Sequence, residues 1–365
     1  MTILSDYWQK IQVSLEPLLD MALPYPLTAT EKQLVRTIDF LRIEQFLESP
    51  SSQRMGRRRV DRRSLFRAFI AKTVYNLPTT ECLAELLRSS PNLRWLCGFE
   101  RLQDVPSSAT FSRAFAEFSK ANLGERIHQA LVTEHMSGQI VMHISHDSTE
   151  VQAREKPAKK KRVPKPAVKR GRPFADEPRV LPPPTRLERQ YDQCPDEALA
   201  ELPIVCNSSA KQDTKGNKHW WTGWKSHLVW GDCGIPLFAI TTSASLHDSQ
   251  AALPMLRKVA SVIRPLYYLA DSAMESDYIR QAAIDLDIVP IIDTRGTRSA
   301  KKKPMDPHRA DRYKQRSTAE RGNSRLKDEF GYRHLRVRGH AKAHMHLMLG
   351  VLSLFADQMY KTLRT

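Results

Sequence analysis

The chain has 365 residues, 41% hydrophobic and 27% charged, and its 57 Lys and Arg residues outnumber 40 Asp and Glu residues to give a net charge of +17. The hydrophobic fraction is enough for a core and excludes a wholly disordered chain, and at roughly 150 residues per domain the length predicts two or three domains. The excess of positive charge indicates a polyanionic partner, most simply nucleic acid.

Membrane and disulfide-rich secreted proteins are not expected. The sequence has no run of about 18 apolar residues for a transmembrane helix, and its start lacks the basic and apolar regions of a signal peptide. The five cysteines are odd in number and never lie two residues apart, so neither a disulfide framework nor a Cys-x-x-Cys zinc site is expected. We therefore expect a cytoplasmic protein with reduced cysteines.

The first part of the chain, residues 1–138, is predicted to be a helical domain. Apolar side chains recur at helical spacing over 62–75, and Thr79 offers a cap for the next helix, which Pro91 ends. A further helix is expected over 109–120. Several short helices with tight turns are typical of a helix-turn-helix-like bundle, so we expect this domain to bind DNA.

A basic run precedes the first of these helices. It contains Arg57, Arg58 and Arg59, which give one helix end a strongly positive face. Such a run is often only a solvated surface. Beside a helical bundle in a basic protein we favour contact with DNA phosphates.

After residue 139 the pattern changes to strands alternating with helices, which predicts a mixed α/β sheet. Two of the strands flank the turn Gly231–Gly234 and form a hairpin. A helix is expected over 274–286, and another after the hairpin, opening at His247-Asp248. The predicted strands are 140–145, 222–230, 235–242, 266–270 and 288–292.

A basic, proline-rich insertion is predicted at about 152–190. Residues 154–173 carry ten Lys and Arg, one Glu and four prolines, a net charge of +9. Such a segment cannot bury enough apolar surface to offset its chain entropy, so we expect a mobile loop. It is either a solvated linker or an arm that follows DNA phosphates through residues such as Lys160, Lys161 and Arg162. We favour the arm.

Two carboxylates follow directly on predicted strands. Asp147 comes after the first strand and Asp271 after the strand at 266–270. Ligand sites in open α/β sheets form beyond the carboxyl ends of strands, so neighbouring strands would bring both carboxylates into one crevice. Carboxylate oxygens are what Mg²⁺ prefers. Aspartate at a strand end is also a common turn or cap residue, so this pattern alone is not specific.

The segment 313–327 is predicted to be one helix apart from its early turn. Arg316, Glu320 and Lys327 would share one face of it, because they are spaced at i, i+4 and i+11. A solvated helix with an ion pair between Arg316 and Glu320 would give the same pattern.

The spacing of Tyr313, Arg316, Glu320 and Lys327 resembles the Tyr-Arg-Glu-Lys (YREK) signature of bacterial insertion-sequence transposases with a DDE catalytic triad. The blocks SHDSTEVQAREKP and LADSAMES resemble the segments around the two catalytic aspartates in that family. The helical stretch SLFRAFIAKTVYNLPTTECLAELL is similar to the domain that precedes its catalytic domain. The resemblance extends in blocks over residues 50–360.

The resemblance implies an α+β, mixed α/β protein with an N-terminal helical DNA-binding domain and an RNase H-like catalytic domain over 139–365, interrupted by the basic insertion. It implies that Asp147, Asp271 and Glu320 are catalytic and bind two Mg²⁺ ions, for which Mn²⁺ can substitute, and that Tyr313, Arg316 and Lys327 contact DNA.

The activity implied is DNA transposition, with endonucleolytic cleavage at the ends of a transposable element and strand transfer into target DNA. The partners would be double-stranded DNA, comprising terminal inverted repeats and target, and a second copy of the chain in the DNA complex. The protein would act on the bacterial nucleoid. A metal-dependent nuclease without strand transfer, or a catalytically silent DNA-binding derivative of the fold, are the alternatives.

Several aromatic and histidine residues have weaker signals. Four tryptophans, at positions 220, 221, 224 and 230, are expected to pack in the core or on a sheet face rather than stack on a DNA base. His146 is either a contact behind Asp147, a phosphate contact, or a strand-end residue with no special role. His344 and His346 are expected to be packing or surface residues of the last helix.

Overall fold

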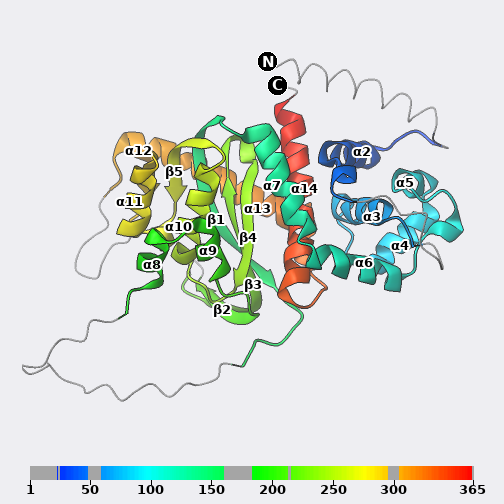
Figure 1. Ribbon diagram of the computed structural model, residues 1–365, viewed down its shortest axis with the longest axis horizontal. Coiled ribbons are helices and arrows are strands. Elements are labelled where there is room, and N and C mark those ends of the chain that lie inside the picture. Colours follow the sequence, from blue (N-terminus) through cyan, green and yellow to red (C-terminus); the bar gives the residue numbers. More distant parts are fainter. Residues whose placement is uncertain are drawn as a thin grey trace, which may run out of the picture.

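The computed structural model describes residues 23, 25–47, 59–159, 183–212, 215–294 and 304–363, which form a helical part and a sheet part joined along two long helices (Figure 1). The helical part contains short helices with ordinary caps. Thr28 forms a capping box with Glu31, Thr79 caps the helix that starts at Thr80, and Ser90 caps a helix with Pro91 in its first turn. These helices are α2 (Ala29–Leu41), α3 (Arg62–Val74), α4 (Thr80–Ser89), α5 (Pro91–Leu96), α6 (Ser108–Lys120) and α7 (Leu123–Met136).

The sheet is mixed, and its order is β2-β3-β1-β5-β6, with β4 pairing to β3. The strands β1 and β5 are parallel neighbours, as are β5 and β6, whereas β3 pairs antiparallel with β1, β2 and β4. The strand bounds are β1 (Ile140–Gln152), β2 (Asn207–Gln212), β3 (Lys218–Trp230), β4 (Pro236–Ser243), β5 (Arg264–Ala270) and β6 (Val289–Ile292).

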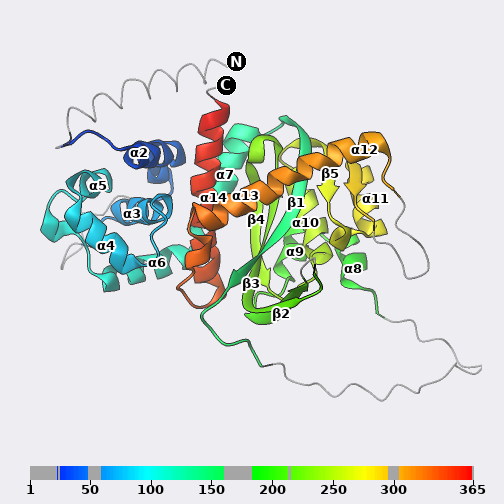
Figure 2. The ribbon, with the colours of Figure 1, turned by 180° about the vertical axis from the view of Figure 1, so that it is seen from behind.

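Helices cover both faces of this sheet. One face carries α10, which packs against β3 and β4 and is flanked by α8, α9 and α11 (Figure 1). The other face carries α13, which crosses β1 and β3 (Figure 2). The helices are α8 (Arg186–Asp192), α9 (Pro195–Ala200), α10 (Ser249–Ala260), α11 (Asp277–Asp285), α12 (Pro307–Tyr313), α13 (Ser317–Asp328) and α14 (His340–Thr362).

The C-terminal helix α14 connects the two parts of the molecule. It packs against α2, α3, α6 and α7 on one side and against β4 on the other. One continuous cluster of buried side chains runs from Leu34 of α2 through Ile144 of β1 to Met359 of α14. The predicted division into domains at residue 138 therefore falls within a shared core. No helix in the described ranges combines the length and apolar character needed to cross a bilayer.

Most predicted elements form, β2, α9 and α12 were not predicted, and several predicted bounds differ. The strand predicted to end at 145 continues to Gln152, because its polar second half pairs antiparallel with β3. Pro91, predicted to end a helix, also begins one, since proline suits the first helical turn. The segment 313–327 is helical apart from its early turn, as predicted, and that turn is the 3₁₀ turn Lys314–Arg316. The last residues of the predicted insertion belong to α8, which starts at Arg186.

The remaining sequence expectations concern the insertion and the aromatic side chains. Residues 160–182, with Lys160, Lys161 and Arg162, lie outside the described residues, as do Arg57 and Arg58. Trp224 and Trp230 are fully buried and Trp221 is 7% exposed, as expected of packing residues, but Trp220 is 67% exposed on β3. His344 and His346 are held in the fold by bonds to Thr241 and to the Gly331 carbonyl.

Candidate active site

Asp147 lies within β1, opposite Leu228 of β3, and not beyond the strand end as the sequence predicted. The first half of β1 pairs in parallel with β5 up to Ser145–Leu269, and the second half pairs only with β3. Asp147 is thus located where β5 has stopped, and its side chain is 18% exposed.

Asp271 comes directly after β5, as predicted. It lies two residues beyond Leu269, just as Asp147 lies two residues beyond Ser145, so the parallel register directs both side chains to the same face of the sheet. Asp271 also caps a short 3₁₀ turn, with an oxygen accepting from the Ala273 N–H at 3.0 Å. The turn-and-cap interpretation of this aspartate is therefore correct as well, and it fixes the carboxylate in place.

The third element is α13, which lies close against the sheet because the face that it buries is built from small side chains. Ala319 and Gly322 are on this face, and a Cβ on Gly322 would come within 2.5 Å of the Trp230 ring. This close approach brings Asn323 to Asp147, where its amide donates to Oδ2 at 2.8 Å. Glu320 lies on the same helix, with its side chain 62% exposed.

Arg316 joins the three carboxylates. Its Nη2 lies 3.1 Å from Asp147 Oδ1 and 3.9 Å from Asp271 Oδ2, and its Nη1 lies 2.9 Å from Glu320 Oε1. The arginine side chain is only 15% exposed. The ion pair with Glu320 expected of a solvated helix is present, but the same guanidinium also binds two aspartates from the sheet, which a solvated helix does not explain.

Burial dominates the electrostatics of this cluster. Desolvation raises the pKa of Asp147 even though Arg316 and Asn323 act to lower it, and the nearby Asp271 raises it further. For Arg316, burial alone would lower the pKa, but the surrounding Asp147, Tyr313, Asp271 and Glu320 raise it overall. The site therefore concentrates negative charge that one guanidinium only partly neutralises.

The donor set fits a hard divalent cation by its chemistry, because it consists of carboxylate oxygens. Among the residues that the structure describes, however, no group of three or more His, Cys, Asp or Glu side chains is arranged to hold a metal ion. In this arrangement the three carboxylates form ion pairs with Arg316.

The other residues predicted to contact DNA lie in two different places. Tyr313 and Lys327 lie near the cluster. Burial raises the pKa of Tyr313, and the charges of Arg316 and Asp271 also affect it. Burial lowers the pKa of Lys327, and the charges of Glu150 and Asp147 act to raise it. Arg59 is exposed and away from the carboxylates, near enough to Glu117 of α6 to help lower the pKa of that side chain.

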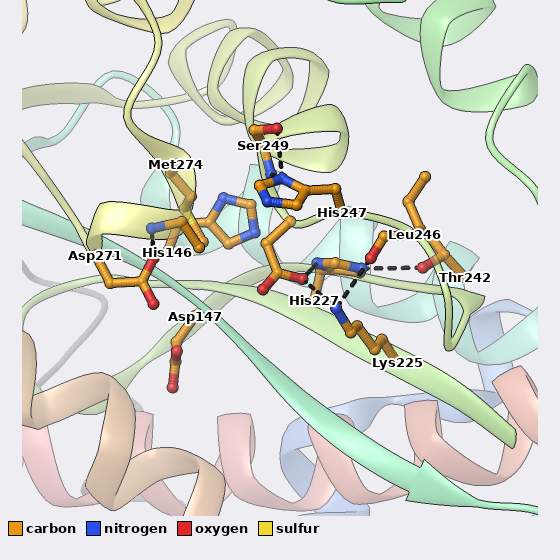
Figure 3. Close-up of polar contacts among 12 residues, drawn as sticks. His146, Asp147, Lys225, His227, Thr242, Leu246, His247, Ser249, Asp271 and Met274 are labelled. Atoms are coloured by element: carbon orange, nitrogen blue, oxygen red, sulfur yellow. Dashed lines mark hydrogen bonds and ion pairs between the residues drawn. The ribbon is translucent and has the colours of Figure 1, made fainter. Parts of the chain in front are cut away.

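A buried polar cluster behind the carboxylates was not predicted as a unit (Figure 3). Lys225 Nζ donates to Asp248 Oδ1 and to the Leu246 carbonyl, each at 2.9 Å, and His227 Nε2 lies 2.9 Å from Thr242 Oγ1. Asp248 precedes α10 as expected, but its side chain makes no cap and binds Lys225 instead. The alternation of Lys225 and His227 on one face of β3 is a signal that could have indicated this cluster.

His146 adjoins this cluster and is fully buried next to Asp147. Its Nδ1 lies 3.4 Å from the Tyr268 hydroxyl, and its ring faces His227 at a centroid distance of 6.0 Å. Burial lowers the pKa of His146 to about 3 and that of His227 to about 4, so both rings are neutral near pH 7. The sheet beneath Asp147 is therefore uncharged at these two positions.

Comparison with known protein families gives two matches. Residues 142–356, more than half of the chain, match the family described as "Transposase DDE domain". Residues 26–117 match the family described as "Transposase domain (DUF772)". A search of curated proteins finds no significant match. The first match spans the sheet, α13 and α14, and the second spans α2 to most of α6.

Proposed function

Since this chain belongs to the transposase DDE domain family, we propose that it cleaves DNA at the ends of a transposable element and joins those ends to target DNA. Cleavage would attach water to a phosphodiester and release a 3′-hydroxyl, which then attacks a phosphodiester of the target. We assign both steps to the site formed by Asp147, Asp271 and Glu320.

The observation that carries this proposal is the convergence of three carboxylates from separate elements on one guanidinium. Asp147 comes from β1, Asp271 from the end of β5 and Glu320 from α13, and all three lie within 3.9 Å of Arg316. Exposed surface ion pairs contribute little to stability and do not account for a buried arginine shared by three acids. Such a charge concentration is typical of a functional site.

In the proposed mechanism Arg316 leaves the carboxylates and binds a DNA phosphate. Its planar guanidinium can hold two phosphate oxygens at once, whereas Lys327 acts as a point charge. Tyr313 would stack on or hydrogen-bond the DNA end. Asn323 would keep the Asp147 carboxylate oriented, because it donates to Oδ2 from the helix that also carries Glu320.

We propose that Asp147, Asp271 and Glu320 hold two Mg²⁺ ions, for which Mn²⁺ can substitute. What such ions supply when bound is activation of the attacking oxygen and stabilisation of the leaving oxygen. The exposed Glu320 is the carboxylate most free to turn toward an ion, because it alone of the three is more than half exposed.

We further propose that the sheet domain is RNase H-like and that Tyr313, Arg316, Glu320 and Lys327 form a YREK signature. The strand pattern supports the first point: β4, β3 and β1 pair antiparallel, and β5 and β6 continue the sheet in parallel. The second is supported by the positions of Tyr313 and Lys327 beside the carboxylate cluster.

The partners proposed are double-stranded DNA, as terminal inverted repeats and target, and a second copy of the chain in the DNA complex. The helical region within 1–138 and the basic residues Arg57, Arg58, Arg59, Lys160, Lys161 and Arg162 would bind phosphates. The net charge of +17 supports a DNA partner. We place this activity in the cytoplasm, on the nucleoid.

A joining assay separates this function from a nuclease without strand transfer and from a silent DNA-binding protein. Duplexes with uncut element ends, and duplexes with pre-cleaved ends and a free 3′-hydroxyl, are each incubated with the full chain and plasmid DNA, with Mg²⁺ or with chelator. We expect joined products only with Mg²⁺. Cleavage of uncut ends without any joining would leave a nuclease, binding without either reaction would leave a silent derivative, and full joining in chelator would contradict the metal requirement.

A further inference from the structure

A second site, with a basic lining, lies where the helical part meets the start of α14. The cavity has a volume of about 370 Å³ and is lined by α3, the start of α4, α6, Arg154 two residues beyond the end of β1, and the segment 334–349. Figure 2 shows the lower end of α14 beside α6, where these segments meet. The cavity is therefore formed by both parts of the molecule and depends on how they are joined.

The charge of the lining is strongly positive. It contains the cations Lys72, Arg154, Arg336 and Lys342, whereas Glu81 is its one acidic side chain. Within the described part of the chain none of these four cations forms an ion pair with a carboxylate. Some arginines elsewhere in the described fold are paired, such as Arg62 with Glu117, whereas here four cations share one cavity. Cations gathered around a cavity without carboxylate partners indicate an anion from outside the chain.

Lys72 is the most enclosed of these cations. Its Nζ donates to the Leu77 carbonyl at 2.9 Å, which leaves two of its three protons for another acceptor. Burial, with Arg336 acting in the same direction, lowers the pKa of Lys72 to about 8, although Cys82 and Glu81 act to raise it. Burial also lowers the pKa of His346 to about 4, with Lys72 contributing. A bound anion would relieve the repulsion among these groups.

Basic residues connect this cavity to the carboxylate site. Lys327 of α13 lies near Arg333 as well as near Asp147, and Arg333 and Lys72 both lie near His334, which lines the cavity. A chain of three basic side chains, Lys327, Arg333 and Lys72, therefore runs from α13 to the cavity, and Arg333 is also paired with Asp328 at 2.9 Å. A single DNA strand passing the active site would meet this chain of charges next.

We propose that the cavity around Lys72 and Arg336 binds a backbone phosphate of the same DNA whose cleavage takes place at the Asp147, Asp271 and Glu320 site. The proposal rests on the proposed function only in taking DNA as the ligand. One phosphodiester carries one negative charge and acceptor oxygens for both side chains. By holding a phosphate against both parts of the molecule, the cavity would fix the register of the DNA relative to α13.

The test combines neutral DNA linkages with variants of the full chain. Element-end duplexes carry a methylphosphonate at one position at a time, which removes one phosphate charge, and binding is measured with wild type, Arg336→Gln and Lys72→Met. Arg336 is exposed, so its variant is safe for folding, while Lys72→Met keeps the length of a half-buried side chain. Arg88→Gln, on the exposed side of α4 and outside the cavity lining, is the matched loss of one charge.

At one position of the duplex, we expect the methylphosphonate to weaken binding by the wild type about tenfold, as for loss of a charged hydrogen bond. At the same position, Arg336→Gln and Lys72→Met should bind the modified and the unmodified duplex equally. These variants should also reduce the slope of log K against log salt by about 0.9, and Arg88→Gln should not show the linkage coupling. Equal losses in all proteins at every position would overturn the proposal.

Two further outcomes are distinct. If inorganic phosphate raises the melting temperature of the wild type but not of Arg336→Gln, while no linkage couples to either variant, the cavity is a site for a free anion and the DNA assignment is wrong. If the linkage coupling is found but the wild type neither cleaves nor joins DNA, the cavity proposal stands and the proposed function fails.

Discussion

Replacing Gly322 by alanine tests whether the close contact of α13 with the sheet sets the geometry of the carboxylate site. A Cβ at this position would lie 2.5, 2.6 and 2.8 Å from three atoms of the Trp230 ring, whereas ordinary contact begins at 3.4 Å. Trp230 is fully buried, so the ring has no open space to enter. We therefore expect α13 to move outward by about 0.9 Å, the difference between 3.4 and 2.5 Å.

The consequences follow from what α13 carries. A shift of that size along the bond from Asn323 to Asp147 would lengthen it from 2.8 Å to about 3.7 Å, beyond hydrogen-bond distance. Misplacing catalytic groups by about 1 Å costs roughly a hundredfold in rate. Overpacking costs about 1–3 kcal/mol, and the better helix propensity of alanine offsets about 1 kcal/mol, so stability should fall by only about 0–2 kcal/mol.

The measurement is single-turnover cleavage of an element-end duplex in Mg²⁺, together with thermal melting. Ser324→Ala is the matched control, because Ser324 is exposed on the same helix. We expect Gly322→Ala to remain folded, bind DNA and cleave about a hundredfold more slowly, while Ser324→Ala cleaves like the wild type. Wild-type cleavage and stability in Gly322→Ala would refute the idea that this contact positions the helix.

Three further outcomes are expected. Burial lowers the pKa of His128 to about 4, so the ring is neutral in the folded protein but takes up a proton below pH 6.5 in the unfolded chain, and the stability of the wild type should fall from pH 6.5 to 4. Thermal melts of His128→Gln should show a shallower fall over this range. A pH profile identical to that of the wild type would contradict this. Trp224→Ala should lose about 3–5 kcal/mol in denaturant unfolding and Trp220→Ala less than about 0.5, because the first side chain is fully buried and the second 67% exposed; equal losses would be incompatible with this burial. Asn323→Ala should slow cleavage about tenfold with DNA affinity kept, because Asp147 loses an orienting donor; unchanged cleavage would exclude that role.

Local patterns predicted much of the fold. The cap at Thr79, the hairpin around Gly231 and the strand before Asp271 follow from short stretches of sequence, and they form where expected. The second half of β1 was missed because its polar residues give no strand pattern by themselves. Their pairing with β3, some seventy residues later in the chain, makes them a strand.

The site was predictable in its members but not in its arrangement. The position of Asp271 directly after a strand and the spacing of Arg316 and Glu320 are visible in the sequence, whereas Asp147, predicted to follow a strand, lies within β1. That Arg316 lies between the three carboxylates depends on how α13 packs, which Gly322 and Trp230 decide through a contact distant in sequence. For the same reason the cavity around Lys72 could not be predicted, since its lining comes from two segments far apart in the sequence, within 69–154 and 334–349.

The most direct test of the central claim is cleavage of an element-end duplex by the full chain with each carboxylate replaced in turn. The variants are Asp147→Asn, Asp271→Asn and Glu320→Gln, and Asp311→Asn is the control, because its exposed side chain on α12 pairs only with Lys314 among the described residues. If the three carboxylates form one site, each of the three variants loses cleavage in Mg²⁺ by a thousandfold or more, while DNA binding and the control remain at the wild-type level. Wild-type cleavage by any one of the three would show that its carboxylate is not part of the catalytic site.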